Sequence, residues 1–523
     1  MSDAMDRGIT VNEIAPMDQP INASTETTAA FVGRALRGPL NTPVLIDNFS
    51  MFRRHFGGMW RHSSLGPAVQ QFFDHGGRKL YIVRVASDAR GAMICLPAAG
   101  GVLVLHALAP GSTELIRAAV DYDGIADGDH FNLTIQRVAP DTGLVADQEI
   151  YLRLSCREDS KAFIVDALLN SALVSVQTPL PQGRPARTTR PGVPFGSSYI
   201  GHAQPGTDGG ELSDYDLVGS VTRGSGIFAL NEVDHFDILY MPPPGKHTDV
   251  GLPAALAAER YCRKRGAMFV MDPPQSWDTV DSAIAGLTGN GILSPISSPN
   301  VLGYFPRVAI AGDEDPVPRV AGAAIAGLLC RLDRQHGPWE DLDQTGFGFD
   351  KRFAPACDLS ISQAQSLVRR GINVITGTGS GRAMLCGSVT AGYGSQLERS
   401  FANLTARRLC LSITNHIERA IRWSVFERNE TRVAERIQAQ VHAYMSALAD
   451  SGAFADDRYM VHCDARLRSN PADPHRGVSV LLAFCPAGCD EPVALTLHQS
   501  VSGCRVAPTA FAPTFDLAIA EVA

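Results

Sequence analysis

Asp234, His235 and Asp237 are the residues whose types and spacing come nearest to a catalytic group. They lie at one end of an apolar run, and catalytic side chains often lie at strand ends in α/β folds. No nucleophile accompanies them, because the chain contains no G-x-S-x-G elbow, no H-E-x-x-H helix and no kinase catalytic loop. We interpret the three residues as a polar turn beside a strand.

Glycines gather between Gly377 and Gly394, directly after the apolar run Asn373–Ile375. A glycine-rich turn after a strand can bind phosphate, but the spacing here is G-x-G-x-G and the P-loop pattern G-x-x-x-x-G-K-[ST] is absent. The sequence therefore favours a long mobile or structural loop over a nucleotide site.

Two sets of residues could bind a metal ion. The first is a group of closely spaced aspartates, Asp121, Asp123, Asp127 and Asp129. A calcium loop of the EF-hand type ends in a bidentate glutamate, and the order of residues here does not fit that pattern, so a solvated turn is favoured. The second set, Cys485, Cys489 and Cys504, lacks the second close pair of a typical zinc site. We expect no metal and no cofactor.

The composition is that of a folded protein. Of the 523 residues, 45% are hydrophobic and 19% are charged, the formal net charge is −8, and like charges form no block. We therefore expect no nucleic acid as a partner. The cysteines are scattered, no apolar stretch could span a membrane, and Met1–Gly8 lacks the basic and apolar regions of a signal peptide. We expect synthesis in the cytoplasm and no membrane insertion.

Alternating strand and helix patterns predict an α/β chain with mixed sheets flanked by helices. The first α/β segment contains apolar runs at Thr28–Gly33 and Leu80–Val85, with phenylalanines at helical spacing between them. A later segment contains a strand at Phe236–Met241 and a helix over Leu252–Arg265. Between the two segments the runs are mostly strand-like and joined by turns, which predicts an inserted β-rich domain.

The C-terminal part has the most regular pattern. Ile413, Ile417 and Ile421 recur along a helix predicted over about 398–427, and Asn429 can cap a second helix that ends at Gly452. Strands are predicted to follow at Tyr459–Cys463, Val478–Phe484 and Pro492–Gln499. Both ends of the chain are strand-like or weakly patterned and have no sheet of their own, which predicts arms that pair elsewhere.

The order of these motifs resembles that of the contractile tail sheath family of phages and related bacterial injection particles. The matching segments cover almost the whole chain: Ile9–Ile14, Thr28–Arg34, Phe56–Gly58, Val69–Phe73, Tyr81–Val85, Pro242–Gly245, Ala258–Arg263, Asp272–Pro274, Tyr304–Pro306, Gly371–Ile375 and Val425–Glu427. The chain departs from the family between Gly377 and Gly394, where sheaths usually carry a strand, and beyond about Ser500, where it is longer than usual. The two-chain sheaths of type VI secretion systems match less well.

The resemblance implies a structural subunit that forms six-fold rings stacked helically around an inner tube. Such a sheath stores energy in an extended state and contracts to drive the tube through a target envelope. The implied partners are other copies of the chain, the inner tube protein, the baseplate, and tail terminator or cap proteins. The particle would be assembled in the bacterial cytoplasm as part of a virion tail or a phage-tail-like particle. The alternatives are a non-contractile scaffold with the same fold and a hydrolase, because the middle part of the family resembles a subtilisin-type fold.

The chain is predicted to divide as follows: an N-terminal arm (1–26), the first part of the α/β core (27–87), an inserted β-rich outer domain (88–200), a middle α/β domain (201–395), a C-terminal sheath domain (396–500) and a C-terminal extension (501–523).

The resemblance also implies that terminal arms add strands to a sheet in the C-terminal domain of neighbouring subunits. We assign this exchange to three strand-like segments, represented by Ile9, Val11, Glu13 and Ile14, by Val478, Val480 and Leu482, and by Val493, Leu495 and Leu497. In the family the C-terminal domain faces the tube, and a contact that must be released should be polar and modest. We assign it to Arg428, Glu430 and Arg432, with pairing along the helix surface as the alternative role of these charges.

Overall fold

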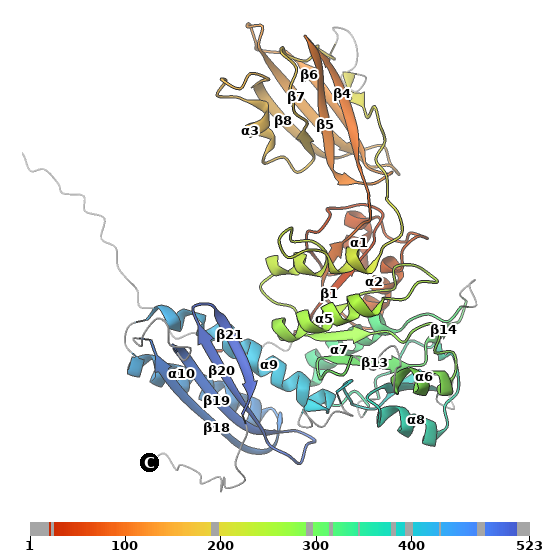
Figure 1. Ribbon diagram of the computed structural model, residues 1–523, viewed down its shortest axis with the longest axis vertical. Coiled ribbons are helices and arrows are strands. Elements are labelled where there is room, and N and C mark those ends of the chain that lie inside the picture. The colour runs from red at the N-terminus through yellow and green to blue at the C-terminus, as the bar shows by residue number, and fades with distance from the viewer. Residues whose placement is uncertain are drawn as a thin grey trace, which may run out of the picture. The chain divides into compact units, whose positions relative to one another are not determined.

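The fold is described from a computed structural model. It describes residues 20–21, 26–189, 198–288, 296–312, 317–343, 346–377, 383–392, 401–427, 430–467 and 476–509. Most of these residues form two compact units, the first between Thr27 and Ala402 and the second from Asn403 onward, with residues 336–341 belonging to the second (Figure 1). In the described part, no helix has the length and apolar character needed to span a membrane.

An eight-stranded sheet forms the centre of the first unit, in the order β17-β16-β13-β12-β11-β1-β3-β2. Its strands are β1 (Thr28–Gly33), β2 (Val44–Ile46), β3 (Lys79–Arg84), β11 (Ile238–Tyr240), β12 (Met268–Met271), β13 (Val301–Phe305), β16 (Asn373–Gly377) and β17 (Ala383–Cys386). The inner strands pair in parallel, whereas the edge strands β2 and β17 are antiparallel to their neighbours. Parallel strands are buried on both faces, which explains their short, continuously apolar sequences.

Helices cover both faces of this sheet. One face packs against α4 (Asp214–Val218), α5 (Leu252–Arg265), α6 (Val280–Leu287), α8 (Ile361–Val368) and the 3-10 helix η2 (Gly226–Glu232). The other face contacts α2 (Leu65–Asp74) and α7 (Gly322–His336). A further helix, α1 (Phe49–Phe56), precedes α2 in the chain. Phe31 of β1 lies between Phe72 and Tyr240, and Gly322 of α7 packs against the Tyr240 ring. The predicted α/β class with mixed sheets flanked by helices is confirmed.

Between β3 and β11 the chain forms a separate two-sheet sandwich. One sheet contains β4 (Gly91–Ala98), β5 (Gly101–Pro110) and β9 (Val174–Val176); the other contains β6 (Leu115–Asp121), β7 (His130–Val138), β8 (Val145–Ser155) and β10 (Ile200–Gly201). Leu103 and Leu105 of the first sheet share one core with Phe131, Leu133 and Ile135 of the second, as expected for stacked sheets. β3 and β11 both pair with β1, so the sandwich interrupts the sequence of the central sheet without interrupting the sheet itself.

A buried arginine orders the chain where the sandwich leaves the central sheet. Arg84 is 1% exposed and donates hydrogen bonds to the carbonyls of Ala35 (3.0 Å), Gly38 (2.6 Å) and Leu36 (3.3 Å). Burial lowers the pKa of Arg84 to about 10, although the nearby Asp208 and Glu114 oppose that effect. The guanidinium therefore supplies hydrogen-bond donors to three backbone carbonyls of the loop after β1, which would otherwise be buried without a partner.

The second unit packs two long helices against a four-stranded antiparallel sheet. It contains α9 (Leu404–Ile421), the 3-10 helix η4 (Arg422–Phe426), α10 (Glu430–Asp450), β18 (Phe454–Arg466), β19 (Gly477–Pro486), β20 (Val493–Ser500) and β21 (Gly503–Pro508). Ile413, Ile417 and Ile421 of α9 are fully buried, as the helical stripe predicts. The helix begins at Leu404 rather than near residue 398, because the Asn403 side chain accepts the Ala406 N–H and caps it.

Two sequence predictions in this part of the chain need correction. Residues 377–394 were expected to form a long loop, but β17 lies within them and pairs with β16. The tail beyond Val501 was expected to have little regular structure, but β21 pairs with β20 from Ser500↔Gly503 to Leu495↔Pro508. Both strands are short, and cross-strand pairing with a neighbour rather than local sequence pattern stabilises them.

Candidate functional site

Six of the residues assigned to strand exchange lie together on one buried face of the second unit. Val478, Val480 and Leu482 are on β19, and Val493, Leu495 and Leu497 are on β20. In the ladder, Val480 pairs with Leu497 and Leu482 pairs with Leu495, and all six side chains are at most 3% exposed. These residues form the core of the sheet within their own chain. Ile9, Val11, Glu13 and Ile14 lie outside the described residues.

The strands that could accept another strand are at the two edges of this sheet. β19 and β20 each have a neighbour on both sides, whereas in the described part β18 pairs only with β19 and β21 only with β20. An edge strand has backbone N–H and C=O groups along its outer side that can pair with an added strand. The geometry thus makes β18 and β21 the candidate acceptors, which the sequence pattern could not distinguish from inner strands.

The residues assigned to the tube contact lie at the start of α10. Arg428 lies outside the described residues, Glu430 is half-buried as the first residue of α10, and Arg432 is exposed. Neighbouring charges already interact within the unit: Arg422 pairs with Glu418 at 3.2 Å, and the Arg436 guanidinium lies 4.3 Å from the centre of the Trp423 ring. The tube contact stays a prediction.

Sequence analysis did not single out an exposed phenylalanine beside these charges. Phe426, the last residue of η4, is 79% exposed. A single exposed apolar side chain is common on protein surfaces, so Phe426 is a candidate for the contact because it lies two residues from Arg428 in the sequence. The sequence pattern could not predict this exposure. The buried stripe of α9 ends at Ile421, and the change to the 3-10 helix η4 places Phe426 outside that stripe.

Two of the residues with catalytic spacing, His235 and Asp237, make contacts beside the central sheet. Asp237 accepts a hydrogen bond from the Thr28 N–H at 2.8 Å and lies 2.7 Å from His235 Nε2. The first contact joins the starts of β1 and β11, and the second is local to the segment before β11, in agreement with the interpretation of these residues as a turn beside a strand.

The two sets of possible metal ligands also bond within the chain. Asp127 accepts hydrogen bonds from the backbone and the ring of His130, which lower the pKa of Asp127 to about 2. Cys485 Sγ donates to the Cys489 carbonyl at 3.1 Å. Across the described ranges, no group of at least three His, Cys, Asp or Glu side chains has the geometry of a metal site.

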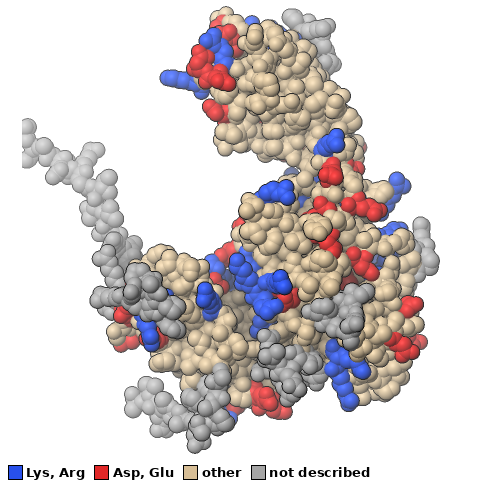
Figure 2. Space-filling model, in the orientation of Figure 1, with Lys and Arg blue, Asp and Glu red and all other residues tan. Residues whose placement is uncertain are grey.

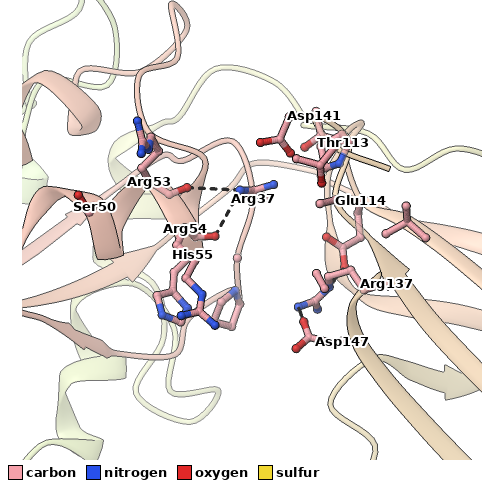
Figure 3. Close-up of a pocket in the computed structure, with 17 residues that line it drawn as sticks. Arg37, Ser50, Arg53, Arg54, His55, Thr113, Glu114, Arg137, Asp141 and Asp147 are labelled. Atoms are coloured by element: carbon pink, nitrogen blue, oxygen red, sulfur yellow. Dashed lines mark hydrogen bonds and ion pairs between the residues drawn. The ribbon is translucent and has the colours of Figure 1, made fainter. Parts of the chain in front are cut away.

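A cavity of about 560 Å³ lies between α1 and the β7–β8 turn of the first unit (Figure 3). One wall carries Arg37, Arg53 and Arg54, and the other carries Arg137 with acidic side chains. Arg37 donates to the carbonyls of Arg53 and Arg54, both at 3.3 Å, and Arg137 pairs with Glu114 (2.6 Å) and Asp147 (2.9 Å). Charges of both signs therefore nearly balance in this cavity.

Comparisons with known proteins define the fold. No protein-family profile and no curated protein sequence matches the chain. Among solved structures, it is similar to a sheath tail protein from Listeria innocua, with 14% identity, a TM-score of 0.59, and coverage of 91% of this chain and 95% of that one. The helical sheath of the anti-feeding prophage in the contracted state shows 14% identity and a TM-score of 0.53 over 94% of this chain and 98% of that chain. The sheath of the extracellular contractile injection system PVC, also contracted, shows 12% identity and a TM-score of 0.52 over 94% and 96%.

The chain therefore has the fold of contractile tail sheath proteins. The similarity extends over nearly the full length of both chains in each comparison, so it includes both units. At this level of identity the likeness establishes the fold, as the resemblance of the sequence motifs implied.

Proposed function

We propose that this chain is the sheath subunit of a contractile phage tail or phage-tail-like injection particle. The observation that carries the proposal is the sheath fold over at least 91% of the chain, at low identity, in both units. Fold alone does not fix function, and the same fold could serve a non-contractile scaffold. The two edges of the β18–β21 sheet, which have no further strand among the described residues, favour an assembling subunit, since they offer backbone groups to a strand of a neighbour.

In this proposal, subunits form six-fold rings that stack helically around an inner tube. Strands exchanged at the β18 or β21 edge would keep neighbours linked while the larger unit of each subunit changes its packing. A difference of only a few kcal/mol per subunit between two packings is enough when many subunits switch together. The inner tube, the baseplate and a terminator or cap protein are the further partners we propose; a six-fold symmetrised baseplate structure is among the structural neighbours.

Electron microscopy of the purified subunit, alone and with its tube protein, tests the proposal. We expect sleeves or tubes of uniform diameter, in a longer and a shorter form when the tube is present. A subunit that stays monomeric at high concentration in the presence of the tube would contradict it. Sleeves that never shorten under destabilising conditions would favour the non-contractile scaffold.

A further inference from the structure

A second cavity of the first unit, of about 600 Å³, has an excess of positive charge. We call it the basic cavity. Among the described residues that line it, the basic side chains are Arg34, Arg61, Lys246 and Arg319, the histidines are His62 and His247, and the acidic side chain is Glu211. The cavity in Figure 3 differs in this respect, because there the charges nearly balance.

The basic cavity lies where the order of the central sheet reverses. From β1 the chain continues to β3 on one side, and from β11 it continues to β12 on the other, so the reversal falls between β1 and β11. Arg34 directly follows β1, and Lys246 and His247 lie in the loop after β11. In open α/β sheets, the crevice at the carboxyl ends of such strands is the usual place for binding. Here the topology places basic side chains in that crevice.

The cations of the basic cavity are held at different depths. Arg34 is half-buried: it donates to the carbonyls of Asp208 (3.1 Å) and Gly209 (2.8 Å) and stacks 4.7 Å from the centre of the Trp60 ring. Burial lowers the pKa of Arg34, but an arginine keeps its charge at neutral pH. Arg61, His62, Lys246 and His247 are exposed at the rim. A fixed guanidinium therefore lies beneath exposed basic side chains, which is an arrangement that favours carboxylates.

We propose that the basic cavity docks carboxylate side chains of a second copy of this chain. The inference rests on the proposed sheath function, because an open helical array is built from contacts between two different surfaces of the same subunit. Each copy has a net charge of −8, and acidic side chains are spread over the face shown in Figure 2, so copies repel unless a local positive surface faces an acidic one. The volume of the cavity is also large enough for a peptide segment rather than a single ion.

Charge reversal at the rim tests the docking. In Arg61→Glu/Lys246→Glu we expect the concentration needed for sleeve assembly to rise about tenfold or more, because the substitutions remove two attractive charges and add repulsion. Assembly of the wild type should also weaken as the salt concentration rises, and the variant should lose most of that dependence. The matched control, Lys264→Glu/Arg369→Glu, makes the same change of charge at two exposed positions that precede β12 and β16, away from the carboxyl ends of the strands, and should assemble like the wild type.

Several outcomes would overturn the docking. If the rim variant assembles as well as the wild type, the docking proposal is wrong. The proposed sheath function is then still supported, because the wild type forms sleeves. If the wild type forms no sleeves, the proposed function is wrong. Sedimentation of the soluble subunits then tests the docking separately, and equal self-association of the wild type and the rim variant would contradict it. Asp313, Glu314 and Asp315 lie outside the described residues but near Arg319 in sequence. If the rim substitutions make the dilute, unassembled subunit easier to unfold, and Asp313→Asn/Glu314→Gln/Asp315→Asn reverses that effect, the cavity serves carboxylates of its own chain. Saturable binding of inorganic phosphate with unchanged assembly would show a small-anion site instead.

Discussion

The Tyr240 hydroxyl donates a 2.6 Å hydrogen bond to the Asp272 carboxylate at the carboxyl ends of β11 and β12. The same carboxylate accepts the N–H of Gly322 at the start of α7, at 3.0 Å. Desolvation raises the pKa of Asp272 to about 6, although both hydrogen bonds act in the opposite direction. The Asp272 carboxylate thus links β11 and β12 to the start of α7, and its pKa of about 6 is near the lower end of the physiological pH range.

Asp272 should make the stability of the first unit depend on pH. Because its pKa is higher in the folded than in the unfolded chain, the folded state binds the proton more tightly, and stability falls as the pH rises from about 4 to 6. The loss is up to about 3 kcal/mol, at ~1.4 kcal/mol per pKa unit, and less where solvent reaches the carboxylate. Urea unfolding across this range should show the slope in the wild type and a much smaller one in Asp272→Asn. Tyr240→Phe removes a bond that favours the carboxylate, so it should move the transition to higher pH; identical slopes in all three proteins would contradict the assignment.

Arg84 should be essential for the stability of the junction between the central sheet and the sandwich. Arg84→Lys keeps the positive charge but cannot reach the carbonyls of Ala35, Leu36 and Gly38 together, so we expect a loss of about 2–4 kcal/mol in the free energy of unfolding. Chemical denaturation of the soluble subunit measures it. Arg90→Lys, at an exposed position of the same junction, should cost less than about 0.5 kcal/mol. Equal effects of the two substitutions would show that the three hydrogen bonds of Arg84 contribute little.

Sequence alone predicts those elements whose ends are set by local chemistry. The helix Leu252–Arg265 has the predicted bounds because Pro253 fits its first turn and Gly266 closes it with a left-handed φ of 67°. β1 was predicted over its observed range because its residues form one apolar run between polar ones. The sequence pattern did not predict the strands β17 and β21, because pairing with β16 and β20, rather than their own sequences, stabilises them. The basic cavity could not be predicted either, since Arg34, Lys246 and Arg319 are distant in sequence and only the order of the strands brings them together.

Lysine substitutions at the sheet edges of the second unit should show which edge accepts a neighbouring strand. Val506 on β21 is 47% exposed, and Met460 on β18 is half-buried. A lysine on an edge strand opposes the addition of another strand, so Val506→Lys should prevent assembly if β21 is the acceptor, and Met460→Lys if β18 is. Each variant should unfold within about 1 kcal/mol of the wild type, because neither side chain belongs to the buried core. Normal sleeves from both variants would argue against strand addition at this sheet.

Deletion of residues 1–20 should leave a folded subunit that does not form sleeves, since we propose that Ile9, Val11, Glu13 and Ile14 act in a neighbouring subunit. Circular dichroism and thermal unfolding should be unchanged, and electron microscopy should show no sleeves. Adding a peptide of residues 1–20 to the deleted subunit tests the reason directly: the peptide should bind the subunit, and the binding should be lost in whichever edge variant fails to assemble. Sleeve formation by the deleted subunit would exclude donation from this end of the chain.

Reversing two charges near the start of α10 should weaken the hold of the sheath on its tube. Arg432 is exposed, and Arg428 precedes it outside the described residues. In Arg428→Glu/Arg432→Glu we expect the subunit to stay folded and the yield of sheathed tubes to fall, most strongly at low salt, where exposed charges are least screened. Phe426→Ser tests the alternative that the apolar side chain beside these charges makes the contact; its effect should persist at high salt, because apolar burial is not screened. A normal yield of sheathed tubes from the double arginine variant, with a reduced yield from Phe426→Ser, would move the tube contact from the charged residues to the end of η4.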